Sequence, residues 1–164
     1  EIGFSQSSMN KSRRSVAAIC EFSDKIHDGL KFPSTLSGVD EQELPADVSE
    51  HLGVFAVKRA DFEAYYDRYH PTILRYSQAV DEQTCSGREV FNFGKSKGMT
   101  FDRTLILPTG PQKAFLRGNT KAFAGGTTDK AVNAFYVAST RARYSIGFLL
   151  DEDVNINGVT NWRP

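Results

Sequence analysis

The sequence predicts an α/β domain whose central sheet is mainly parallel. Short apolar segments with the length of buried strands alternate along the chain with segments of helical periodicity. Such runs are typical of parallel strands covered by helices on both faces. A length of 164 residues, 40% of them hydrophobic and 24% charged, suits a single globular domain with its own core. We therefore predict one domain over residues 1–164, with flexible ends at 1–11 and 151–164.

Helical periodicity and turn residues divide the first half of the chain. Apolar side chains at helical spacing predict a helix over residues 12–30, with Ser12 able to cap its N-terminus. Pro, Gly and a series of carboxylates predict an acidic loop over 31–50. A short apolar run predicts a strand over 53–57, and bulky aromatic residues at helical spacing predict a helix over 60–69.

In the second half, apolar strands alternate with polar connections. Residues 72–76 (T-I-L-R-Y) fit either a strand or a continuation of the preceding helix. Residues 88–93 alternate as a strand does, and 103–107 form a β-rich apolar run, so both are predicted strands. Polar residues, Gly and Pro predict loops over 77–87 and 109–129. A loop as long as the second one tends to be functional or mobile.

The segment V-N-A-F-Y-V-A-S-T-R-A-R, residues 132–143, predicts a helix that buries one face and ends in two arginines, Arg141 and Arg143. It leads into an apolar strand over 145–150. A guanidinium held at the end of a packed helix is suited to reach a phosphate or a carboxylate. A surface ion pair is the alternative interpretation of Arg141, and Arg143 is expected to be structural.

Charge is unevenly distributed although the formal net charge is zero. Residues 39–50 carry only acidic charges, whereas 94–121 carry basic charges with Asp102 as the one exception. A neutral chain with this asymmetry can present a basic face to a polyanion. On charge alone, a solvated surface is the favoured interpretation.

Cysteine and histidine usage predicts neither a disulfide framework nor a metal site. Cys20 and Cys85 lie far apart and form no C-x-x-C motif. The histidines, which are His27, His51 and His70, lack metal-ligand spacing and are interpreted as surface or capping residues. Free thiols suit a reducing cytoplasm, and no run of eighteen apolar residues predicts a membrane span. We therefore expect a cytoplasmic protein.

Residues 94–98 (G-K-S-K-G) form a glycine-bounded basic turn after the predicted strand 88–93. Ligands of open α/β sheets bind beyond the carboxyl ends of strands, where this turn is expected. Glycines let backbone N–H groups approach an anion closely, and lysines add positive charge. A merely exposed basic turn is the alternative. The turn is not a Walker A loop, because G-x-x-x-x-G-K-[ST] does not occur in the chain.

Three motifs together resemble those of UvrD/Rep-like superfamily 1 DNA helicases. G-K-S-K-G-M-T-F-D followed by F-Y-V-A-S-T-R-A-R resembles motifs V and VI, with family patterns of approximately H-x-x-K-G-L-E-F-D and Y-V-A-x-T-R-A. S-R-R-S-V-A-A-I resembles motif IV, in which Arg14 and Ile19 hold the family spacing. The resemblance spans Ser12 to Leu150. It implies the C-terminal, second RecA-like domain of a helicase: a three-layer α/β domain without a P-loop of its own.

The resemblance implies roles for three groups of residues. The expected catalytic residues are Arg141, as the motif VI arginine finger, and Arg14, as the motif IV arginine that reaches the γ-phosphate. The residues expected to bind the nucleotide are Gly98, Thr100, Arg13 and Lys97. The residues expected to contact single-stranded DNA are Asn92, Gly94 and Lys95.

The chain departs from the family pattern at three of these positions. Thr100 replaces a ribose-binding glutamate, Arg13 replaces an adenine-stacking tyrosine, and Gly94 replaces the motif V histidine. A hydroxyl can still bond to ribose, and a guanidinium plane can also stack. The chain has no Walker A lysine and no Walker B acidic pair. The resemblance therefore implies that ATP and Mg²⁺ are held mainly by a separate N-terminal RecA-like domain, and that this fragment alone is inactive.

The predicted function is that of the C-terminal domain of an ATP-dependent DNA helicase or translocase. Its expected partners are single-stranded DNA and the N-terminal RecA-like domain of the same polypeptide, and no membrane is involved. Two alternatives stay open. One is a non-catalytic nucleic-acid or protein-binding module with a degenerate helicase fold. The other is a nucleotide-binding enzyme of another class, such as a kinase, and the lack of a phosphate loop counts against it.

Overall fold

The computed structural model describes residues 11–27, 34–124 and 128–164. The strands are β1 Lys11–Ser12, β2 Leu36–Ser37, β3 Gly53–Lys58, β4 Thr72–Arg75, β5 Val90–Asn92, β6 Phe101–Leu107, β7 Ala142–Leu150 and β8 Thr160–Asn161. The α-helices are α1 Ala17–Asp24, α2 Ala46–Ser49, α3 Phe62–Tyr69, α4 Glu82–Cys85, α5 Gly110–Leu116 and α6 Asp129–Ser139. The 3₁₀ helices are η2 Glu41–Glu43, η3 Arg59–Asp61 and η4 Phe93–Ser96.

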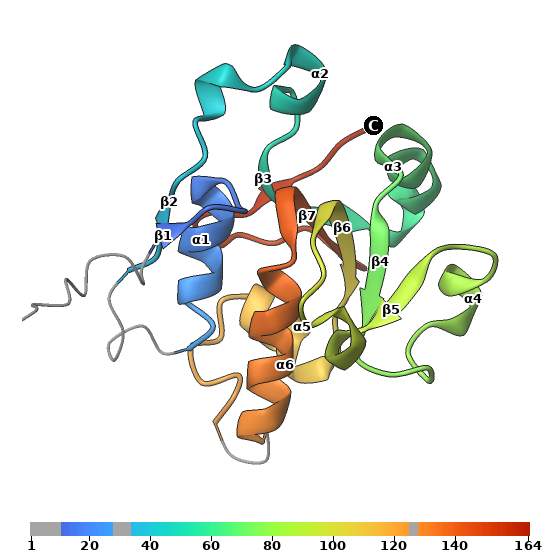
Figure 1. Cartoon of the computed structure of the whole chain (residues 1–164). Helices are drawn as coiled ribbons and strands as arrows, with labels where there is room; N and C mark the ends of the chain where they lie inside the picture. The colour runs from blue at the N-terminus through green and yellow to red at the C-terminus, as the bar shows by residue number, and fades with distance from the viewer. Residues whose placement is uncertain (1–10, 28–33, 125–127) are drawn as a thin grey trace, which may run out of the picture.

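Six strands form one sheet in the order β5-β4-β6-β7-β3-β8, and each neighbouring pair is parallel (Figure 1). The prediction of a mainly parallel α/β sheet is thus confirmed. Because the strands run in one direction, their first residues share one edge, here called the amino edge, and their last residues share the opposite carboxyl edge. The short strands β1 and β2 pair separately from this sheet, also in parallel.

The sheet is buried on both faces, which explains the apolar runs in its sequence. Along β6, Leu105 and Leu107 pack into one core, while Ile106 points to the other. The core that contains Ile106, here called the first core, lies between the sheet and α1, α5 and α6, which contribute Ile19, Leu116 and Phe135. The core that contains Leu105 and Leu107, here called the second core, includes side chains from α3 and α4. The molecule therefore has three layers, with α1 and α6 on the other side of the sheet from α3 and α4 (Figure 1).

The prediction of a helix beginning at Ser12 is wrong, because α1 begins at Ala17. Ser12 does not cap the helix: it pairs with Ser37 between β1 and β2, and its hydroxyl accepts hydrogen bonds from the backbone N–H groups of Arg14 and Ser15. The backbone N–H of Val16 then bonds to the carbonyl of Arg143 in β7 at 3.0 Å. Pairing with other strands thus keeps this segment extended, and the expected helix end at 28–30 lies outside the described residues.

Short helices replace parts of three predicted loops. Segment 31–50 contains β2, η2 and α2, segment 77–87 contains α4, and segment 109–129 contains α5. α5 begins with a capping box in which Thr109 and Gln112 satisfy each other's backbone N–H groups. The T-G-P-Q sequence carries that signal, which our loop prediction overlooked. The ambiguous segment 72–76 contains strand β4, because its backbone pairs with β5 and β6.

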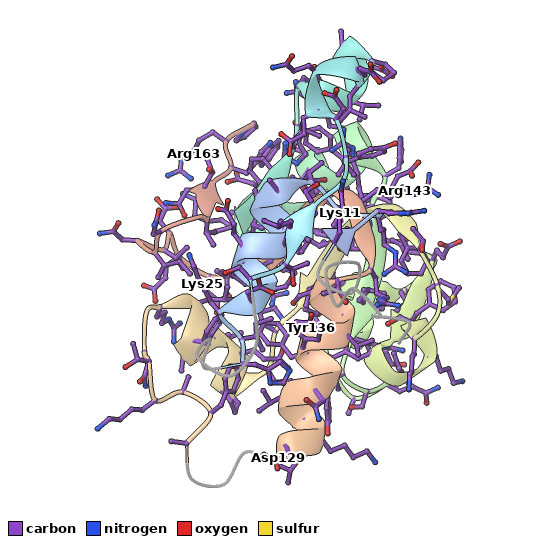
Figure 2. The ribbon with its side chains drawn as sticks, turned by 60° about the vertical axis from the view of Figure 1, so that its left-hand side comes forward. Lys11, Lys25, Asp129, Tyr136, Arg143 and Arg163 are labelled. Carbon is purple, nitrogen blue, oxygen red and sulfur yellow. The ribbon has the colours of Figure 1, made fainter. Side chains whose placement is uncertain are left out.

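The helix predicted over 132–143 ends earlier, at Ser139, and β7 already begins at Ala142. The backbone N–H of Phe101 bonds to the carbonyl of Arg141 at 2.9 Å, so pairing with the neighbouring strand interrupts the helix. Arg141 therefore follows the helix, and Arg143 belongs to a strand. Figure 2 shows Asp129 at one end of α6, with Arg143 beyond the other end and pointing outward.

The segment 151–164, expected to be a flexible end, packs against the domain. Strand β8 pairs with β3, and the Trp162 backbone N–H donates to the carbonyl of Ala56 at 2.8 Å. The Trp162 side chain is buried in the second core. Of the other expected flexible end, only Lys11 lies within the described residues, in β1.

The histidine prediction fails at His51, which is buried rather than at the surface. Its ring stacks between Phe55 and Tyr69, with centroids 3.8 Å away on each side, and its Nε2 lies 3.0 Å from the Tyr65 hydroxyl. Burial lowers the pKa of His51 to about 3, helped by the positive charge of Arg103. None of the described helices has the length and apolar character that crossing a membrane requires.

Candidate nucleotide and nucleic-acid interface

The segment carrying Arg13 and Arg14 is held against the first residues of β7. The Ser15 hydroxyl is buried and donates to the carbonyl of Ala142 at 2.7 Å. On its other side, the Ser12 hydroxyl accepts from the two backbone N–H groups that follow Arg13. These bonds place both arginines at the amino edge of the sheet, next to the end of α6.

Arg14 and Arg141 converge on Thr140, the residue that terminates α6. Arg14 Nη1 donates to the carbonyl of Thr140 at 2.9 Å. Arg141 Nη2 donates to the hydroxyl of Thr140 at 3.0 Å, and its Nε donates to the carbonyl of Val137 at 2.9 Å. The last carbonyls of a helix lack partners within the helix and carry partial negative charge, so they hold guanidinium groups well. Two distant parts of the sequence thus present their cations side by side.

Neither Arg14 nor Arg141 has an acidic partner within the described ranges, although other arginines there form ion pairs. Burial lowers the pKa of the Arg141 guanidinium, and the neighbouring charge of Arg14 lowers it further. A pair of like charges held close together gains stability when an anion binds between or beside them.

A hollow of about 790 Å³ opens beside Arg14, and Arg141 does not line it. Arg13, Arg14 and Thr100 all line it, so the structure brings together residues from two of the segments predicted to bind the nucleotide. Arg143 also lines the hollow and lies 3.7 Å from Asp102, consistent with the structural role expected for it. Two acidic residues, Asp40 and Glu43, complete the polar lining. We did not predict their presence, because they come from a segment expected to be a loop.

The basic turn does not lie wholly at the carboxyl edge, contrary to our expectation. Asn92 ends β5 at that edge, in register with Arg75 of β4 and hence with Leu107 of β6. The chain then crosses the sheet through η4 and starts β6 at the amino edge, where Phe101 pairs with Ala142. Parallel pairing of β5 and β6 with β4 requires this crossover. Asn92, predicted to contact DNA, and Thr100, predicted to bind the nucleotide, therefore lie at opposite ends of one crossing segment.

The two glycines of the crossover differ in backbone conformation, and its two lysines are both exposed. Gly98 has a φ of +84°, a conformation that favours glycine, whereas Gly94 does not. Lys95 and Lys97 are exposed, and no acidic group pairs with either one in the part of the chain that the structure describes. Phe93 and Ser96 are buried, so η4 is anchored while Lys95 within it and Lys97 after it are exposed.

No group of three or more His, Cys, Asp or Glu residues within 11–27, 34–124 and 128–164 is placed to hold a metal ion. The two cysteines are free and buried. The guanidinium and ammonium groups described above offer the chemistry of anion binding.

The fold is similar to that of a solved domain from a possible DNA helicase. The structure resembles the C-terminal domain of a possible DNA helicase from Lactobacillus plantarum WCFS1, with a TM-score of 0.54 and 14% identity over 92% of this chain and 98% of that one. The likeness confirms the predicted fold class, a RecA-like α/β domain with a mainly parallel sheet.

A second solved structure, PRRSV helicase, has a TM-score of 0.47 and 19% identity over 87% of this chain. The chain spans about a quarter of that helicase's length, 23%. No protein-family model matches the sequence, and no curated protein matches it.

Proposed function

We propose that this chain is the second RecA-like domain of an ATP-dependent DNA helicase or translocase of the UvrD/Rep-like type. In this role its amino edge faces a nucleotide bound by a first RecA-like domain of the same polypeptide. Arg141 and Arg14 reach the γ-phosphate from Thr140, and Arg13, Lys97, Gly98 and Thr100 lie toward the rest of the nucleotide. ATP, with Mg²⁺ held mainly by the first domain, supplies the free energy of hydrolysis.

One observation carries this proposal: Arg14 and Arg141 converge on the end of α6, and no carboxylate of the described residues forms an ion pair with either one. Each guanidinium uses some of its N–H groups for backbone or hydroxyl oxygens of Val137 and Thr140 and keeps others available. That arrangement fixes the position of the charge and leaves donors for a phosphate. A structural ion pair would instead place an acidic group against at least one of them.

In mechanism, the arginines stabilise negative charge that develops on the transferring phosphoryl group. They do so only while the two domains are closed on the nucleotide, so hydrolysis weakens the closed state. On the carboxyl edge, Asn92, Gly94 and Lys95 contact the phosphates of single-stranded DNA. Opening and closing of the cleft between the two RecA-like domains then moves the DNA contact of this domain relative to that of the first domain. The fragment alone has no phosphate cradle and is expected to be inactive.

The full-length protein with Arg141→Ala tests the proposal. DNA-stimulated ATP hydrolysis is expected to fall by about 10³-fold, the usual value of an arginine finger. ATP binding, measured by equilibrium titration, should stay nearly unchanged because the first domain holds the nucleotide. Arg117→Ala is the matched control: this exposed arginine forms an ion pair with Glu152 at 3.1 Å, and its loss should not affect turnover.

Unchanged turnover in Arg141→Ala would refute the finger assignment. The alternative of a non-catalytic binding module is tested by the full-length sequence itself. If no G-x-x-x-x-G-K-[ST] motif and no acidic pair lie elsewhere in the polypeptide, the helicase proposal fails and the binding module is favoured.

A further inference from the structure

The Tyr76 ring stands out as an exposed aromatic surface at the carboxyl edge. Tyr76 directly follows β4 and is 42% exposed as a residue. Among large apolar side chains within the described residues, Leu36 is the other one that is exposed to such an extent. The ring meets that of buried Phe93 at 84°, with centroids 6.1 Å apart. Phe93 therefore holds the ring in place while a large part of it stays open to solvent.

Strand register places Tyr76 beside the basic crossover. Arg75 and Asn92 are paired at the ends of β4 and β5, so the residues that directly follow these strands, Tyr76 and Phe93, are neighbours too. Successive side chains of a strand point to opposite faces. Leu74 packs in the same core as Phe93, whereas Arg75 turns away and donates to the carbonyl of Val80 at 3.4 Å. Tyr76 thus lies on the side of the sheet that carries η4.

The chemistry around the ring suits a strand of unpaired nucleotides. Asn92 offers an amide, Gly94 leaves its backbone unobstructed, and Lys95 offers an exposed ammonium group. An exposed ring beside cationic and amide groups is the arrangement with which proteins bind single strands, because every base has a face that can stack. Base pairs of a duplex present only their edges in the grooves, so the ring offers a duplex no equivalent contact.

We propose that Tyr76 is a base-stacking residue for single-stranded DNA, supported by Phe93 and next to the phosphate contacts of Asn92, Gly94 and Lys95. The proposal rests on the DNA contact in the proposed function and adds to it a residue that binds the base rather than the phosphate. It predicts that this edge of the domain binds single-stranded DNA more tightly than an abasic oligomer with the same phosphodiester backbone.

The test measures direct binding by fluorescence anisotropy, using the whole 164-residue chain. The probes are a labelled oligothymidylate and an abasic oligomer with the same phosphodiester backbone. Tyr76→Ala should weaken oligothymidylate binding about tenfold and leave binding of the abasic oligomer unchanged. Tyr76→Phe keeps the ring and should bind as the wild type does. Because the side chain is exposed, circular dichroism of both variants should match the wild type.

Lys95→Ala is the matched control for charge. It should weaken binding of both oligomers and lower the slope of log affinity against log salt by about 0.7, the value for one phosphate contact on a single strand. If Tyr76→Ala weakens both oligomers equally or neither of them, the stacking proposal is wrong. If Tyr76→Ala weakens neither oligomer but Lys95→Ala weakens both, the DNA contact of the proposed function is still supported. If the wild type binds neither oligomer, the stacking proposal and that DNA contact both fail, and the test of Arg141 is unaffected.

Discussion

The amino and carboxyl edges of the sheet both carry positive charge, but they hold it differently. At the amino edge, Arg14 and Arg141 are partly buried and donate to oxygen atoms at the end of α6. Along the crossover, the exposed Lys95 lies in the short helix η4 and the exposed Lys97 directly follows it. The first arrangement fixes a charge in space, whereas the second supplies charge without fixing its position.

This difference matches the demands of the two ligands in our proposal. Stabilising charge on a transferring phosphoryl group requires donors at fixed positions, since a displacement of about 1 Å can cost two orders of magnitude in rate. Holding a flexible polyanion that slides requires attraction without a fixed geometry. One crossing segment, residues 92–101, connects the two edges and would couple DNA contact to nucleotide contact.

The largest expected effect, on ATP hydrolysis, comes from replacing the Arg141 guanidinium with another positively charged group. Arg141→Lys in the full-length protein should lower DNA-stimulated ATP hydrolysis by about 10³-fold, nearly as much as alanine does. An ammonium group cannot donate to Val137 and Thr140 with the geometry of the guanidinium and still reach a phosphate. Steady-state turnover at saturating ATP and DNA measures this effect.

The exposed charge provides the control for that substitution. Lys95→Arg also keeps its charge, and DNA affinity should stay within about twofold of the wild type because the contact depends on charge alone. If Arg141→Lys retained full turnover, the contrast between a fixed and an unfixed charge would be wrong.

An intermediate effect is expected from the buried network that supports the amino edge. Arg103 of β6 donates to the carbonyls of His51 and Val48 and to the Ser145 hydroxyl near the start of β7. The pKa of His51 is about 3 in the folded state, whereas an ordinary histidine has a pKa of 6.5. Between these two pH values His51 binds a proton in the unfolded chain but not in the folded one. Stability is therefore greatest above about pH 6.5 and falls as the pH drops toward 3.

Urea unfolding at pH 7 and at about pH 4.5 measures this loss, which should reach roughly 2–3 kcal/mol from His51. Carboxylates also titrate over this range, so the relevant quantity is the difference between the wild type and His51→Gln. The variant should lose less stability over the same range. Equal losses in both proteins would show that His51 is protonated in the folded state, against the burial seen here.

The smallest effect separates the two glycines of the crossover. Gly98→Ala places a Cβ at a φ of +84° and should cost about 1 kcal/mol of the free energy of unfolding. Gly94→Ala adds a methyl group to open space at an ordinary backbone conformation and should change stability by less than about 0.5 kcal/mol. Thermal or urea unfolding of the two variants gives the comparison. Equal costs would mean that the backbone does not distinguish these positions.

Local patterns in the sequence predicted most strands and the helix over 60–69, and they failed where pairing with distant strands competes with helix formation. The segment before Ala17 and the segment after Ser139 both have helical composition. The first bonds instead to β7, and the second bonds to the start of β6. The short capping signal at Thr109 was present in the sequence and was overlooked. His51 and Trp162 appeared to be polar-surface or tail residues, because only packing shows that their rings are buried.

The sequence by itself determined the layers of this protein and the identity of its candidate site residues. Apolar runs bury strands on both faces wherever helices can cover them, and the spacing around Arg14, Gly98 and Arg141 carries the helicase resemblance. Only the tertiary structure decided that Arg14 and Arg141 meet at Thr140, that Thr100 shares a hollow with Arg13, and that Asn92 lies at the opposite edge. Residues far apart in the chain meet through strand register and crossovers, and local patterns do not specify those.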